Sequence, residues 1–205
     1  MGCSMHAIAL EYPWVVWRDI RRVSDLYYPW DAMAKNIETG ETINLSNDPD
    51  TGERVWGSVV DIDLKGGLAA WAAGSATGTE RFHEIVSVDL RTGARQVVSD
   101  GIGHELDATV TEDWVTWVDM RDDPGATAMS PCLGDIYGYD RRTREEHALV
   151  TEGDVMHGPW LDAEGPWLVY TDHRWDPEPR CDSDREASVV AFHLPTLTEV
   201  RITDW

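Results

Sequence analysis

The sequence predicts an all-β fold made of four tandem four-stranded units. Three observations support this prediction: the chain repeats with a period of about fifty residues, β-branched and aromatic residues fill short runs between Gly, Asp and Pro, and helical periodicity is absent over any useful length. The chain has 205 residues, of which 42% are hydrophobic, so it can bury a sizeable core. This composition argues against intrinsic disorder.

The first repeated feature is a four-residue apolar run, which begins with tryptophan in three of its four copies. The runs occupy 14–17, 68–71, 114–117 and 167–170. Their last residues are spaced by 54, 46 and 53 positions. The chain contains 11 tryptophans, and we attribute those in the runs to packing between neighbouring units, which favours large side chains.

The second repeated feature is an alternating segment that enters a turn, at 31–40, 84–93, 135–144 and 188–197. Its threonines lie at positions 39, 92, 143 and 196, which are spaced by 53, 51 and 53 residues. Two independent features therefore report the same period.

Each unit can be divided into four short strands. The predicted first strands are 7–10, 58–62, 108–111 and 159–162, and the predicted last strands are 41–45, 95–98, 145–150 and 199–202. Four-stranded units in tandem are typical of β-propeller blades. We predict a single β-propeller domain over 1–205, with blades at about 5–48, 55–101, 104–153 and 157–205.

The third copy carries the clearest motifs, Trp117-Val118-Asp119-Met120-Arg121 and then Asp135-Ile136-Tyr137-Gly138-Tyr139-Asp140. These motifs resemble the TolB-type β-propeller repeat, and the resemblance extends over essentially the whole chain. The second copy departs from the pattern, with Ala73 and Ser75 where Asp and Arg are expected.

The resemblance implies a closed ring of six or seven blades, whereas this chain has four units. Three explanations remain open: a true four-bladed ring, a fragment of a longer protein, or an open arc that another chain completes. We favour a fragment or an incomplete ring.

Acidic and basic residues recur as pairs near the end of the second predicted strand. The pairs are Asp19 with Arg21, Asp119 with Arg121, and Asp172 with Arg174. Because an active site needs unlike groups that converge on one point, a pair repeated in three blades favours a structural role, such as a turn bond or an ion pair between blades. We predict no catalytic residue.

Histidines form a second candidate site. His104 and His157 each precede a predicted first strand, and His6 lies near the same place in the first copy. First strands line the central channel of a propeller, so these rings could converge there as metal ligands or as an acid and base pair. The alternative is a polar strand entry in which each ring caps a backbone group.

Two long loops follow the apolar runs of the third and fourth copies, at 122–134 and 175–187. They hold Cys132 and Cys181, which either pair as a disulfide or remain two thiols. Loops of this size on one rim usually carry a binding surface. Trp175 and Arg180 are the side chains that we expect to anchor a partner.

The charge excludes some partners. With 38 acidic and 17 basic residues, the formal net charge is −21, and binders of nucleic acid or anionic membranes need a basic surface. Alternate aspartates such as Asp61 and Asp63 supply hard oxygen ligands, but no calcium-loop pattern follows them. We therefore predict no membrane insertion and no cofactor, with weak divalent-cation binding as the alternative.

The resemblance implies a non-enzymatic module that binds a protein or cell-envelope partner, in the periplasm or outside the cell. The first six residues carry no signal peptide pattern. Self-association that completes the ring is a further expectation. The alternative function is a metal-dependent polysaccharide lyase with a histidine-lined channel, although a surface of charge −21 would repel an acidic polymer.

Overall fold

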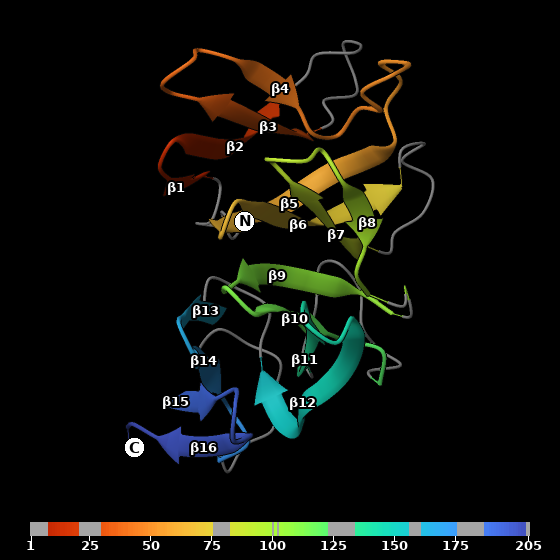
Figure 1. The fold of residues 1–205 in the computed structure, drawn as a ribbon. Helices are drawn as coiled ribbons and strands as arrows, with labels where there is room; N and C mark the ends of the chain where they lie inside the picture. Colours follow the sequence, from red (N-terminus) through yellow and green to blue (C-terminus); the bar gives the residue numbers. More distant parts are fainter. Residues whose placement is uncertain are drawn as a thin grey trace.

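The computed structural model contains four antiparallel sheets that follow one another in an arc (Figure 1). It describes residues 8–20, 30–75, 83–99, 101, 103–122, 134–155, 161–175 and 187–203. In every sheet the four strands are hydrogen-bonded in chain order. The all-β prediction, with four four-stranded units, is confirmed.

The sheets are called blades 1 to 4. Blade 1 contains β1 (Ile8–Glu11), β2 (Trp14–Ile20), β3 (Trp30–Asn36) and β4 (Thr42–Asn44), and blade 2 contains β5 (Trp56–Lys65), β6 (Leu68–Ser75), β7 (His83–Asp89) and β8 (Arg95–Val97). Blade 3 contains β9 (Glu105–Val110), β10 (Trp114–Asp119), β11 (Gly134–Asp140) and β12 (Glu145–Val155), and blade 4 contains β13 (Leu161–Glu164), β14 (Trp167–Asp172), β15 (Ser188–His193) and β16 (Thr198–Arg201).

The strands that differ most from their predicted bounds are β5 and β12, and β12 ends at Val155 instead of residue 150. β5 extends over 56–65 instead of 58–62, and its pairing with β6 shifts register between Gly57 and Val59 and again between Val59 and Ile62. Such irregularities place extra residues on one strand. The alternation of side chains is thereby interrupted, which is why the sequence pattern did not show the full length of β5.

Blades pack face to face, and the four-residue runs supply the contact. The third run position in the first three blades, Val16, Ala70 and Thr116, is fully buried, and Val16 and Ala70 belong to apolar clusters shared with the following blade. The fourth position in the last three blades, Trp71, Trp117 and Tyr170, is at most 1% exposed against the preceding blade. Because successive side chains of a strand point to opposite faces, one short run serves two interfaces.

Polar contacts near the inner strands reinforce this packing. The carboxylate of Glu11 in blade 1 accepts hydrogen bonds from the amides of Gly66 (3.0 Å) and Gly67 (2.8 Å) in the β5–β6 turn. Asp63 of blade 2 accepts bonds from the Thr109 hydroxyl (2.9 Å) and the Val110 amide (2.8 Å) of blade 3. Consecutive blades are thus joined by charge-assisted bonds as well as by apolar faces.

Blades 1 and 4 stand at opposite ends of the arc, and the ring is open (Figure 1). This agrees with the expected incomplete ring. Within the described ranges, no helix is long and apolar enough to cross a membrane.

The turn before each fourth strand has the same left-handed position in all four blades. Gly40 and Gly93 occupy it with φ of 77° and 75°, whereas Arg144 and Leu197 occupy it with φ of 64° and 51°. In blade 2 the Asp89 carboxylate accepts the amides of residues 91 and 92 and holds the turn. Glycine fits this position because it has no Cβ, so the later two blades carry backbone strain there.

We predict that Leu197→Gly raises the free energy of unfolding by about 0.5 kcal/mol, because relief of left-handed strain outweighs the added freedom of the unfolded chain. Leu197 is exposed, so its removal loses little packing. Urea denaturation measures the change. The control Gly93→Ala should lower stability by about 1 kcal/mol, and equal effects of the two variants would contradict the strain argument.

Candidate functional site

The inner ends of the blades surround a cavity of about 200 Å³ that residues from all four blades line. Its charged residues are Glu11 from β1, Asp63 and Lys65 from β5, and Asp162 and Glu164 from β13. This cavity is the start of a propeller's central channel, and four of its five charged groups are carboxylates.

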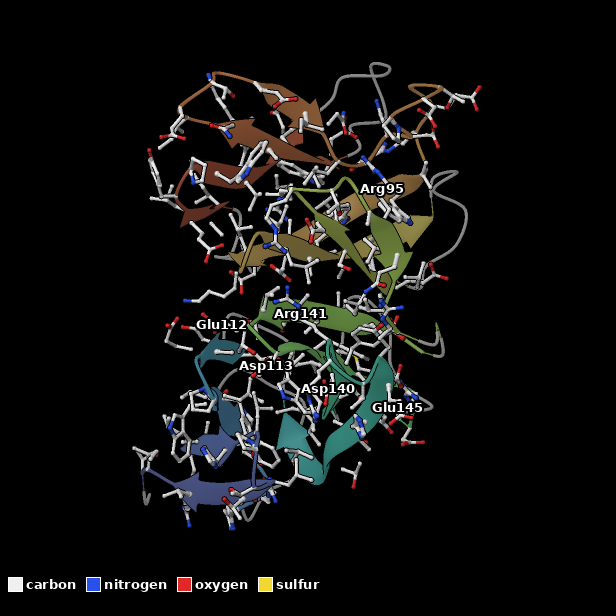
Figure 2. All side chains as sticks on the ribbon, viewed as in Figure 1. Arg95, Glu112, Asp113, Asp140, Arg141 and Glu145 are labelled. Carbon is white, nitrogen blue, oxygen red and sulfur yellow. The ribbon has the colours of Figure 1, made fainter. Side chains whose placement is uncertain are left out.

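Lys65 neutralises part of this acidic lining. Its Nζ lies 3.0 Å from Glu164 Oε1 in blade 4 and 3.8 Å from Glu112 Oε1 in blade 3; Figure 2 labels Glu112. The hydrogen bond to Glu164 raises the pKa of Lys65. Glu11 and Asp63 accept bonds from neighbouring blades, and Lys65 pairs with Glu164. Four of the five charged groups thus have structural partners, and the cavity is a junction between blades.

His104 does not line this cavity. It precedes β9, is buried, and stacks on His83 of β7, with ring centroids 4.8 Å apart and Nδ1 atoms separated by 3.1 Å. His104 thus belongs to the boundary between blades 2 and 3. The other two histidines of the predicted cluster, His6 and His157, lie outside the described residues, so their convergence stays a prediction.

His83 was not among the histidines that the repeat pattern predicted. It begins a third strand in the one copy that departs from the repeat motif, and no spacing connects it to His104. Among the described residues, no group of three or more His, Cys, Asp or Glu side chains is arranged to hold a metal ion.

The Asp119–Arg121 pair forms a buried cluster at the end of β10. Asp119 Oδ2 accepts bonds from Arg121 Nη2 (2.6 Å) and Trp117 Nε1 (3.1 Å), and Asp119 Oδ1 accepts the Arg121 amide (2.8 Å). Arg121 also pairs with Glu146 of β12 at 2.9 Å and stacks over the Tyr137 ring at 3.8 Å. The pair therefore ties the turn after the second strand to the third and fourth strands of one blade.

Blade 4 repeats this cluster. Asp172 accepts the Arg174 amide (2.8 Å) and Arg174 Nε (2.6 Å), and Arg174 reaches Glu199 of β16 at 2.8 Å. Blade 1 differs, because Asp19 is exposed and accepts only the Ile20 amide among the described contacts; Arg21 lies outside the described residues. Glu146 and Glu199, which pair with the two arginines, occupy the same repeat position. An alignment of the repeat copies would therefore have identified these two glutamates.

Trp175 is held by two cations. Its ring lies 4.9 Å from the Arg174 guanidinium carbon and 4.5 Å from that of Arg201, which are favourable cation–π distances. The side chain remains 41% exposed, so its ring is oriented and accessible. Arg180, Cys132 and Cys181 lie outside the described residues, and the rim site and disulfide stay predictions.

Asp135, in β11, is a partly buried carboxyl group with a raised pKa. It pairs with Asp119 across β10 and β11. Burial, with the nearby charges of Asp122 and Asp119, raises the pKa of Asp135 to about 6. Perturbed groups gather at functional sites, but here the main cause is burial, to which two neighbouring carboxylates add.

Comparison with solved structures shows a β-propeller fold of the TolB-like kind. The β-propeller domain of the Trilobed protease from Pyrococcus furiosus, described as having an open velcro topology, matches with a TM-score of 0.62 at 12% identity, over 97% of this chain and 54% of that chain. TolB from Acinetobacter baumannii matches with a TM-score of 0.58 at 13% identity, over 96% of this chain and 43% of that chain.

A prolyl endopeptidase matches with a TM-score of 0.64 at 11% identity, over 98% of this chain and 30% of that chain. This chain thus spans about half or less of the length of these structures. No family model matches the chain, and no curated protein matches it. At these identities the comparisons establish the fold alone.

We predict that Asp119→Asn lowers the free energy of unfolding by about 3 kcal/mol, because it leaves the half-buried Arg121 guanidinium without its closest counter-charge. Chemical denaturation at pH 7 measures this loss. Asp122→Asn is the matched control, since it removes an exposed carboxylate from the same turn and should change stability by about 0.5 kcal/mol or less. Similar losses in both variants would argue against a stabilising pair.

We predict that Asp135→Asn raises stability above pH 6 and not at pH 4. The pKa of Asp135 in the folded protein, about 6, exceeds the value of about 3.9 in unfolded chains. The folded state therefore binds more protons in this window, and the wild type loses stability as pH rises from 4 to 6. Denaturation at both pH values measures the gain, which we expect to be about 1–3 kcal/mol. A gain of the same size at pH 4 would show that the carboxyl charge is not its cause.

Proposed function

We propose that this chain is a non-enzymatic protein-interaction module, which docks protein through the two ends of its open arc. The occupant that we propose is a second copy of the chain, with blade 4 of each copy packed on blade 1 of the other. The observation that carries this proposal is that positions buried in the inner blades are exposed on the outward faces of the end blades.

The third residue of the four-residue apolar run shows this difference in exposure for blade 4. Val16, Ala70 and Thr116 are fully buried, whereas the equivalent Val169 is 41% exposed. Val169 lies opposite Ala191, which lies opposite Val200, so the three share one face of the sheet. We call this surface the blade 4 end face; it comprises Trp167, Val169, Ala191, Val200 and Ile202.

Blade 1 shows the complementary exposure. At the fourth run position, Trp17 is only half-buried, whereas its counterparts in the other blades are buried. Ile8 and Leu10 of β1 lie opposite Trp17 and Val15 and are exposed. This blade 1 end face comprises Ile8, Leu10, Val15, Trp17 and Met33.

The repeat explains why a second copy fits. The blade 4 end face uses the positions with which blade 3 contacts blade 4, and the blade 1 end face uses the positions with which blade 4 contacts blade 3. A blade 4 to blade 1 contact would therefore repeat an interface that the chain already forms. Two copies joined at both ends would make a closed two-fold ring, which is the commonest symmetry of soluble oligomers.

The charge opposes such a dimer at low salt, because each copy carries −21. Salt screens this repulsion but leaves apolar burial intact, so association should strengthen as salt increases. The cell-envelope partner and the periplasmic location that the TolB-type resemblance implies remain predictions. No observation on the described residues favours the polysaccharide-lyase alternative.

We predict a mass of twice the 23.1 kDa chain at about 100 μM protein and about 0.5 M salt, where charge repulsion is screened. Sedimentation equilibrium or light scattering measures it. Val169→Glu and Leu10→Glu should each yield monomer, because a charge is placed in an apolar contact. Mixing the two variants should restore a dimer, since one intact blade 4 to blade 1 contact remains.

Val97→Glu is the matched control. Val97 is a valine of β8 in an inner blade with 47% exposure, so the same substitution there should leave the dimer unchanged. A wild-type monomer at this concentration, or dissociation by Val97→Glu as complete as that by Val169→Glu, would overturn the proposal.

A further inference from the structure

A groove of about 270 Å³ opens between blades 2 and 3. Blade 2 contributes Ser87 and Asp89 from β7 and Gln96 from β8, and blade 3 contributes Tyr139 from β11 with Arg141 and Arg144 from the turn that follows. Figure 2 labels Arg141 near the boundary of these two blades. The groove is separate from the central cavity and from the end faces.

The groove is locally basic in a protein of net charge −21. Arg144 is exposed and forms no ion pair with any residue of the described ranges. Arg141 uses Nη1 to donate to the Thr111 carbonyl (2.6 Å), which fixes its guanidinium against the turn of blade 3. One carboxylate lines the groove, Asp89, and it is bound by Arg91 at 3.1 Å and by two backbone amides.

Arginine crowding adds to this basic character. Burial lowers the pKa of Arg141, and the neighbouring Arg91 guanidinium lowers the pKa further, whereas the carboxylates of Asp89, Asp113 and Glu112 oppose these effects. A bound anion would relieve the repulsion between the two guanidinium groups. Since the molecule as a whole repels anions, binding of one would have to come from such a local site.

Ser87 gives a second, independent indication of a ligand. Ser87 is a lining residue of the groove, its side chain is 0% exposed, and no hydrogen-bond partner for its Oγ exists among the described residues. The equivalent positions in the other blades are Ala34, Gly138 and Ala191. The fold therefore does not require a hydroxyl here, yet buried hydroxyls are nearly always hydrogen-bonded.

Ser87 lies directly opposite Gln96 in the β7–β8 register, so a hydroxyl and a side-chain amide line one wall while two arginines line the other. Guanidinium groups bind oxyanions through two parallel hydrogen bonds, and hydroxyl and amide groups supply further donors.

We propose that the groove between blades 2 and 3 binds a small molecule through a carboxylate or phosphate group, with Arg141 and Arg144 as charge partners and Ser87 and Gln96 as additional donors. The volume exceeds that of a bare ion and suits a ligand of about amino-acid size. This site does not depend on the association of two copies.

The test titrates the full chain separately with succinate and with inorganic phosphate, following backbone amide shifts by NMR. We expect saturable shifts at Ser87, Ala94 and Gln96 with at least one of the probes; saturation by succinate alone assigns a carboxylate, and saturation by phosphate alone assigns a phosphate. Arg144→Gln should weaken binding about tenfold, the usual loss for one charge-assisted bond.

Arg142→Gln is the matched control, because it removes one positive charge from the same turn. Arg142 is exposed, lies 3.6 Å from Asp140 and does not line the groove, so its loss should change affinity by about twofold or less. Ser87→Ala introduces alanine, the residue that blades 1 and 4 carry at the equivalent position. This variant should fold normally and bind the probe more weakly.

The proposal is overturned if neither probe saturates up to about 20 mM, a range that covers weak millimolar ligands. It is also overturned if Arg142→Gln and Arg144→Gln weaken binding equally, which would indicate general charge attraction, or if the shifts map to another surface.

Discussion

Face-to-face packing of consecutive sheets is the interaction on which the rest of this structure depends. A single four-stranded sheet of this size has two apolar faces, and burial of one against each neighbour supplies most of its stabilisation. Trp71, Trp117 and Tyr170 fill the same place in three successive interfaces. The arc therefore has a core that runs through it from blade to blade.

The same constraint decides where polar groups lie. Between blades, a charged group is retained where it has a partner across the interface, as Glu11 and Asp63 do with backbone amides of the next blade. Within a blade, Asp119 with Arg121 and Asp172 with Arg174 fasten the turn after the second strand to the fourth strand. The aspartates of these pairs are buried, so the loss of one partner is costly, whereas a surface pair would contribute little.

Exposure and charge then separate the three surfaces of interest. The end faces are apolar because the repeat equips every blade for two neighbours, and blades 1 and 4 have one each. The central cavity is acidic and crosslinked by Lys65. The groove between blades 2 and 3 is basic, and its serine replaces the alanine or glycine of the other copies. The end faces belong to the two blades that have only one neighbour, and the groove contains a serine that departs from the repeat.

The sequence by itself determined the fold class, the four units and the positions of the repeated Asp–Arg pairs, because periodicity records which residues occupy equivalent places. It could not determine the length of β5, where bulges interrupt the alternation, or the stacking of His104 on His83, since these residues belong to different blades. Only the tertiary structure decided which copy of a repeated position is covered. Trp17 and Trp71 are the same residue type at the same repeat position, yet one is half-buried and the other fully buried, because burial depends on the neighbouring blade and not on the strand itself.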